Sequence, residues 1–132
     1  MKGVWDVGHL RGWLAGLTML AMVMPALAAS TEDVRPYDEK LLRLAEILGA
    51  VHFLRELCGA DDGQLWRQQM LTLMDAEGST LSRRVRFASR FNTGYRSYRR
   101  TYQACTSGAK DQTGRFLAEA AEIAKSLAEQ KP

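Results

Sequence analysis

Residues 81–106 read LSRRVRFASRFNTGYRSYRRTYQACT, and this stretch carries the clearest signal of the fold. At 100° per residue its aromatic side chains, with Ala88 and Cys105, fall within one third of a helix circumference. We therefore expect a long helix over residues 81–106. Gly94 is a point where it could kink, break into two shorter helices or let a neighbour approach closely. The aromatic residues are Phe87, Phe91, Tyr95, Tyr98 and Tyr102.

Arginine dominates the other side of this expected helix. Seven arginines lie between residues 83 and 100, and no Asp or Glu occurs between Gly78 and Lys110. Arg84 falls within the aromatic face and Arg99 just off its edge. A surface of this kind can attract phosphate groups, acidic glycans, anionic lipid heads or an acidic protein face. The candidate partner or anion surface consists of Arg83, Arg86, Arg90, Arg96, Arg99 and Arg100.

Three further helices are expected around this stretch, because apolar residues recur at helical spacing in each. No segment alternates with period two over a useful length, so the pattern predicts no strand. We expect an all-α fold, a small up-down bundle of about four helices with one disulfide. The further helices are expected over residues 37–57, after Pro36, and over 64–77 and 111–129. The expected caps and turns are Gly59, Asp61-Asp62-Gly63, Ser79 or Thr80, and Ser107-Gly108-Ala109.

The N-terminal residues have the three parts of a cleavable secretory signal. Lys2 and Arg11 precede a nearly uncharged apolar stretch, and Ala26-Leu27-Ala28 has the small-x-small form that signal peptidase accepts. We expect residues 1–28 to be a signal peptide, 29–35 a flexible polar tail and 36–132 the helical domain, in the periplasm. The alternative is a retained anchor, although an apolar stretch of 17 residues is short for a span.

Both cysteines lie after this signal. An even number of cysteines in an exported chain is typical of a disulfide, and two cysteines can pair in only one way. In an up-down bundle the ends of the first and third helices meet at the same end, which permits a Cys58–Cys105 link. A redox pair, a metal site or free thiols are the alternatives, but the chain has no C-x-x-C.

The sequence contains no convincing catalytic constellation. His52 is the single histidine after the signal and lies in mid-helix, where a packed side chain is the ordinary interpretation. Glu56, Asp61 and Asp62 form the densest acidic group, and paired carboxylates can act as acid and base, but turn formation and capping explain them as well. There is no phosphate-binding glycine loop and no metal-ligand spacing. We expect no enzyme and no cofactor.

The arginine surface has two possible meanings. It could bind an envelope protein or an anionic glycan or lipid, with Trp66-Arg67 extending it. Alternatively the aromatic residues are core and the arginines a solvated face paired with acids of neighbouring helices. Nucleic acid is not an expected partner of an exported chain, and a membrane would be reached only through an uncleaved signal. Without Lys2, Arg11 and Asp6, the chain's net charge of +3 falls to +2, which is modest.

Residues 54–77 and 82–109 resemble a family of small exported alphaproteobacterial proteins without an assigned function. The matching pattern is Leu-Cys-Gly, Trp-Arg, Arg-Arg, Phe-Asn-x-Gly-Tyr-Arg and Thr-Tyr-x-x-Cys-Thr. It falls here on Leu57–Gly59, Trp66-Arg67, Arg83-Arg84, residues 91–96 and residues 101–106. The resemblance implies a periplasmic location and the same cysteine pair, and no activity.

The same pattern contains polar and small residues that form either a structural motif, with an interhelical hydrogen-bond network, or a binding site. These motif residues are Trp66, Asn92, Gly94, Tyr95 and Tyr102.

Together these observations favour a non-enzymatic periplasmic interaction module, an adaptor or regulator of the cell envelope. The alternative is a binder of peptidoglycan, lipopolysaccharide phosphate or lipid headgroups through the third helix.

Overall fold

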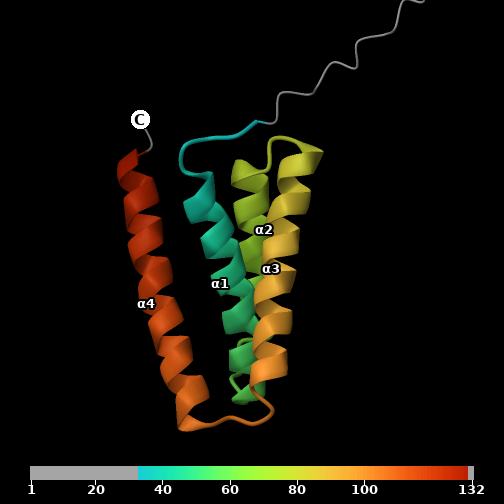
Figure 1. The fold of residues 1–132 in the computed structure, drawn as a ribbon, viewed down its shortest axis with the longest axis vertical. Coiled ribbons are helices and arrows are strands. Elements are labelled where there is room, and N and C mark those ends of the chain that lie inside the picture. The colour runs from blue at the N-terminus through green and yellow to red at the C-terminus, as the bar shows by residue number, and fades with distance from the viewer. Residues whose placement is uncertain (1–32, 131–132) are drawn as a thin grey trace, which may run out of the picture. The chain divides into compact units, whose positions relative to one another are not determined.

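The computed structural model describes residues 33–130, which form four antiparallel helices and, within that range, no strand. Successive helices run in opposite directions (Figure 1). The expected all-α, up-down bundle is therefore confirmed. The helices are α1 (Asp38–Leu57), α2 (Leu65–Glu77), α3 (Leu81–Thr101) and α4 (Ser107–Gln130).

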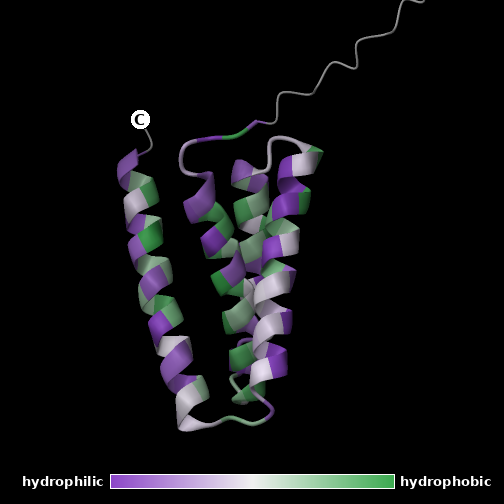
Figure 2. Ribbon diagram, in the orientation of Figure 1, coloured by the Kyte–Doolittle hydropathy of each residue, from purple (hydrophilic) through white to green (hydrophobic). Residues whose placement is uncertain are grey.

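The central helix is α1, which alone packs against all three of the others within the described residues. Its apolar residues are distributed around the helix, as expected of a helix surrounded by neighbours. Figure 2 shows apolar (green) and polar (purple) residues mixed on its visible side. One apolar cluster joins the first half of α1 to α2 and α3, and a second joins the later half to α4. The first contains Leu41, Leu42, Ala45, Leu48, Met70, Phe87 and Phe91. The second contains Ile47, Ala50, Val51, Phe53, Leu54, Ala109 and Phe116.

Two glycines bring α1 and α3 into direct backbone contact. A Cβ atom on Gly94 would lie 2.0 Å from the carbonyl oxygen of Glu46, and one on Gly49 would lie 1.9 Å from that of Phe91. No real Cβ approaches an oxygen so closely, so only glycine fits at either position. Because α3 continues unbroken through Gly94, close approach is the role of this glycine, and the helix does not break there.

Two of the expected caps are confirmed. Gly59 has a φ of 68°, the left-handed conformation with which many helices end, and it follows Cys58, the residue after the last one of α1. Thr80 caps α3 by accepting a hydrogen bond from the Arg83 N–H at 3.2 Å. Asp62 does not cap α2: its carboxylate binds the side chains of Arg55 and Trp66 instead.

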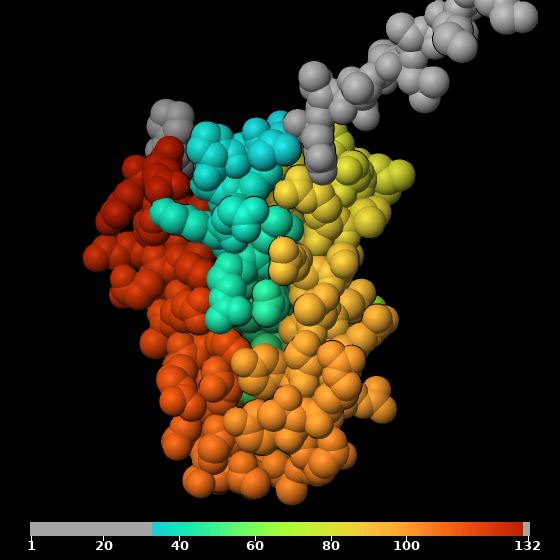
Figure 3. All heavy atoms as spheres, viewed as in Figure 1, coloured from blue at the N-terminus to red at the C-terminus, as the bar shows by residue number. Residues whose placement is uncertain are grey.

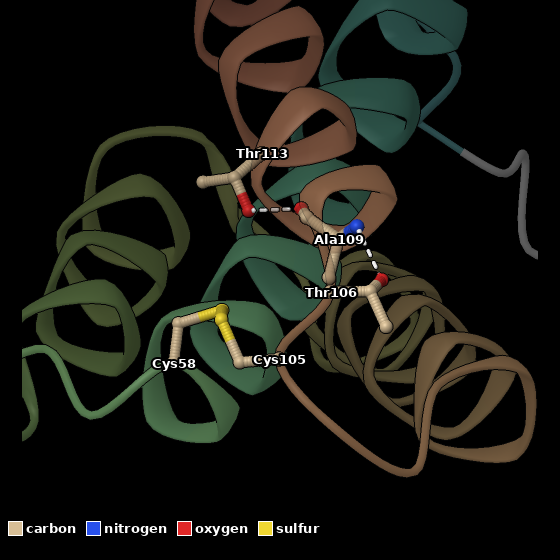
Figure 4. Close-up of a disulfide and its surroundings, with 5 residues drawn as sticks. All are labelled: Cys58, Cys105, Thr106, Ala109 and Thr113. Atoms are coloured by element: carbon tan, nitrogen blue, oxygen red, sulfur yellow. Dashed lines mark hydrogen bonds between the residues drawn. A yellow bond between two sulfur atoms is a disulfide. The ribbon is translucent and has the colours of Figure 1, made fainter.

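The junction between α3 and α4 differs from the expected boundaries. The third helix ends at Thr101 and not at residue 106, because Tyr102 is extended, with φ −115° and ψ 123°. The fourth helix begins at Ser107 and not at 111. Thr106 Oγ1 accepts a hydrogen bond from the Ala109 N–H at 3.1 Å, which is the geometry of a threonine N-cap (Figure 4). The expected Ser107-Gly108-Ala109 turn is thus the first turn of α4.

The expected disulfide is confirmed. Cys58 follows α1, Cys105 lies between α3 and α4, and their Cα atoms are 4.9 Å apart (Figure 4). The link ties the end of the central helix to the junction that leads into α4. Neither cysteine is free.

The expected signal peptide, its cleavage site and the first part of the polar tail lie outside the described residues. The expectation that residues 29–35 form a flexible tail does not hold at its end, because Arg35 is held against the helices. Its guanidinium donates to Glu77 at 2.8 Å, and its backbone N–H donates to Asp38 at 3.0 Å. The ordered chain therefore precedes Pro36. No helix among residues 33–130 has the length and apolar character needed to cross a bilayer.

Candidate functional site

The arginines of α3 divide into two groups. Arg83 was expected on the outer surface, and this expectation is wrong: it is only 2% exposed. Its Nη1 donates to Asp38 Oδ2 at 2.6 Å and its Nη2 contacts Asp38 Oδ1, while the guanidinium stacks 5.2 Å from the Phe87 ring. The helical spacing places Arg83 outside the aromatic sector, but a carboxylate at the start of α1 draws it inward.

Arg84, Arg86 and Arg90 are also engaged by the protein itself. Arg84 donates to the carbonyl oxygen of Met74 at 2.9 Å and to Asp75 at 3.2 Å. Arg90 lies 3.8 Å from Glu46. Arg86 is half-buried and close enough to lower the pKa of Asp38. For this half of the helix, the interpretation as a face paired with neighbouring acids is the better one.

The later arginines are different. Arg96, Arg99 and Arg100 are exposed, and among the described residues their guanidinium groups have no hydrogen-bond or ion-pair partner. We call these three residues, with Gln103, the arginine surface. The four residues line one shallow depression, and the Gln103 amide donates to the carbonyl oxygen of Arg99 at 3.0 Å. The helical spacing i, i+3 and i+4 explains why the three arginines share one face, and Gln103 reaches the same place from the segment that follows the helix.

Aromatic side chains on the side of α3 that faces α1 and α4 hold this end of the helix in place. Tyr98 meets Phe116 edge to face, with ring centroids 5.0 Å apart, and stacks on Tyr102 at 6.3 Å. Tyr95 packs on Phe53 at 5.5 Å. In the space-filling view, the end of α3 and the following residues form the lower part of the visible face (Figure 3). The arginines therefore project from a well-anchored helix end.

The residues of the recognised pattern contribute mainly structure. Tyr95 donates from its hydroxyl to Glu56 at 3.2 Å, and burial together with that carboxylate raises the pKa of Tyr95. Trp66 is half-buried and donates to Asp62 at 2.8 Å. Asn92 is exposed and lines a groove between α2 and α3 that also contains Arg67. The interhelical hydrogen bond of Tyr95 supports the network interpretation for that residue.

The candidate catalytic groups do not form one cluster: His52 lies beside Glu56, and Asp62 is engaged by other residues. His52 is 6% exposed between the rings of Phe91 and Tyr95, its Nδ1 has no hydrogen-bond partner, and its Nε2 lies 3.8 Å from Glu56. Asp62 is occupied by Arg55 and Trp66. Hydrogen bonds from these two side chains lower the pKa of Asp62 to about 2. Residues 33–130 contain no group of three or more His, Cys, Asp or Glu able to hold a metal ion.

One feature of the surface was not anticipated. An apolar groove lies over α1 between α2 and α4, which do not pack against each other. The sequence contained a signal for this groove, because the expected first helix has apolar residues around its whole circumference. Three neighbouring helices leave one sector of such a helix uncovered. The groove is lined by Tyr37, Leu41, Leu44, Leu73, Ala76, Glu77, Ala124, Leu127 and Ala128.

Comparison with known protein families gives a match. The family model described as protein of unknown function (DUF2385) matches residues 36–130, which include all four helices and the disulfide. No curated protein and no solved structure matches the chain.

Proposed function

The chain belongs to the DUF2385 family, and from its own geometry we propose that it is a non-enzymatic interaction module of the bacterial cell envelope, an adaptor or regulator that binds an anionic partner. The observation that carries this proposal is the arginine surface. Three exposed guanidinium groups on one helix face have no acidic counterpart among the described residues, while the earlier arginines of α3 are engaged.

The electrostatics of α3 support a partner of negative charge. Cationic side chains at the end of a helix are favoured by its dipole, so part of their presence has a purely structural cause. That cause does not explain why three cations share one helix face with no ion-paired carboxylate among the described residues. An uncompensated cluster projects a positive field that speeds the encounter with anionic surfaces and weakens as salt rises.

The proposed location rests on the N-terminal sequence and the disulfide. Residues 1–28 have the charge, apolar stretch and Ala26-Leu27-Ala28 site of a cleaved signal, and disulfides persist in the oxidising periplasm. We also propose that the protein comes from an alphaproteobacterium and that the motif pattern described above is a feature of its family. The non-enzymatic part is supported by the division of the candidate acids between two sets of contacts: Asp62 is held by Arg55 and Trp66, while Glu56 lies beside His52 and accepts from Tyr95.

A second candidate is a binder of anionic envelope material, such as glycan, lipopolysaccharide phosphate or lipid headgroups. The shallow, open form of the depression between the three arginines favours it, because a small anionic group fits there without any rearrangement of the helices. A protein partner would need a larger area around the same residues.

Co-sedimentation with envelope fractions tests the proposal. The protein should sediment with envelopes of its own cell at low salt, and the variant with Arg96→Glu, Arg99→Glu and Arg100→Glu should remain in the supernatant. The matched control reverses three exposed cations of α4, with Lys110→Glu, Arg115→Glu and Lys125→Glu. If both variants lost sedimentation equally, net charge alone would explain the binding, and the claim of a specific binding surface would be contradicted.

A further inference from the structure

We propose that the arginine surface is a binding site for a phosphate group, held by Arg96, Arg99 and Arg100. This inference rests on the proposed function and names the chemistry that the surface recognises. The phosphate can belong to a lipid headgroup or to a free phosphorylated molecule. Both present the same tetrahedral anion to the three guanidinium groups.

The arrangement of the donors favours phosphate over carboxylate. Each guanidinium carries parallel N–H donors that bind two oxygens at once. Arg96, Arg99 and Arg100 reach one depression from three positions on adjacent turns, at i, i+3 and i+4. A carboxylate has two oxygens in one plane and satisfies one or two such forks. A phosphate has oxygens in several directions and can serve all three.

The charge inside the depression also favours an anion from outside. A second depression on α3 contains Arg86 and Arg90, but Glu39 lines it as well, and Glu46 lies 3.8 Å from Arg90. The arginine surface contains no acid: its fourth residue is the neutral Gln103. The protein thus neutralises one basic depression itself and leaves the other without a counter-charge.

The end of a helix normally opposes an anion, because its last carbonyl groups point outward with partial negative charge. Here one of those carbonyl groups, that of Arg99, is already occupied. The Gln103 amide donates to the Arg99 oxygen at 3.0 Å. The negative end of the helix is therefore partly covered where the anion would sit, and three full positive charges outweigh what remains.

Titration with inorganic pyrophosphate, followed through the arginine Nε–H resonances, tests the site on the disulfide-bonded protein produced from the full chain. We expect the signals of Arg96, Arg99 and Arg100 to shift, with an affinity at least tenfold higher than for citrate, a multiply charged carboxylate. The variant with all three arginines changed to Gln should lose this binding. The control Lys110→Gln, Arg115→Gln and Lys125→Gln should retain it. Citrate binding as tightly as pyrophosphate, or no binding of either, would overturn the proposal.

Vesicles separate the two sources of phosphate. Binding to phosphatidylcholine vesicles that contain phosphatidylglycerol, reversed by pyrophosphate, would assign the site to a membrane headgroup. Pyrophosphate binding without vesicle binding would assign it to a free phosphorylated molecule, and either result supports a phosphate site. If neither probe binds but envelope co-sedimentation still requires the three arginines, the phosphate inference fails and the proposed function stands. If co-sedimentation does not require them either, both fail.

Discussion

Asp38 and Arg83 form a buried, two-pronged ion pair between the first turn of α1 and the first turn of α3. The Nη1–Oδ2 distance is 2.6 Å, and the two residues are 3% and 2% exposed. Burial raises the pKa of Asp38, but hydrogen bonds from Arg83 and from the Arg35 backbone outweigh it and leave that pKa below its ordinary value. The pair fixes the register of the two helices at the end of the bundle that lies far from the arginine surface.

Removing one member of this pair should destabilise the protein strongly. Arg83→Met leaves a buried carboxylate without its cationic partner, which costs roughly 3 to 5 kcal/mol of unfolding free energy. Arg84→Met removes a half-exposed pair with Asp75 and should cost less than about 1 kcal/mol. Urea unfolding measures both. Similar small losses in the two variants would mean that Arg83 is not the structural residue described here.

Replacing the glycines should have opposite effects in α3 and α4. Gly94→Ala places a Cβ against the Glu46 carbonyl, so the helices must separate, at a cost of about 1 to 3 kcal/mol or more. A Cβ on Gly114 meets nothing within 4 Å, and Gly114→Ala should stabilise the protein by about 0.5 to 1 kcal/mol. Thermal unfolding of the two variants checks this, and a harmless Gly94→Ala would contradict the close packing of α1 and α3.

The disulfide should contribute substantially to stability. It joins residues 47 apart in the chain, and the chain-entropy model assigns about 4 kcal/mol to a loop of that length. The double variant Cys58→Ser, Cys105→Ser should lose most of this in urea unfolding. Dithiothreitol should lower the stability of the parent protein to the same level and leave the double variant unchanged. If dithiothreitol did not change the stability of the parent protein, this role of the disulfide would be contradicted.

Acid should weaken the junction between α1 and α2. The pKa of Asp62 is about 2 in the folded protein, because Arg55 and Trp66 donate hydrogen bonds to its carboxylate. A lowered pKa means that the stabilisation is complete above the unfolded value near 3.8 and is lost as the pH falls from about 4 towards 2. Asp62→Asn should show a smaller dependence of stability on pH in this window, and Trp66→Phe an intermediate one. Identical pH dependence in all three proteins would contradict the assignment.

Much of the fold could be predicted because the apolar periodicity of a helix and the residues at its ends are signals within a short stretch of sequence. Apolar spacing gave four helices, and the up-down order brought Cys58 and Cys105 together. The boundary errors had a local cause as well: Ser107-Gly108-Ala109 resembles a turn, but Thr106 is an N-cap that starts α4 there. Thr106 was the available signal, since threonine is a preferred residue before the first helical turn.

The candidate site was harder to predict, because burial depends on partners distant in sequence. Nothing within residues 81–106 distinguishes Arg83 from Arg96. The first meets Asp38, which is 45 residues away, and the second meets no acid among the described residues. The helical spacing could define the set of arginines but not divide it. That division required the packing of α3 on α1.

Site-specific photo-cross-linking in living cells tests the central claim most directly. A photo-reactive amino acid at Asn92 lies about one helical turn before Arg96 on the same face, and one at Glu122 lies on the exposed side of α4. We predict a cross-linked envelope component from position 92, absent from position 122 and lost when Arg96, Arg99 and Arg100 are changed to Glu. The same adducts from both positions, or adducts at 92 that survive the charge reversal, would contradict the claim that this surface binds an anionic partner.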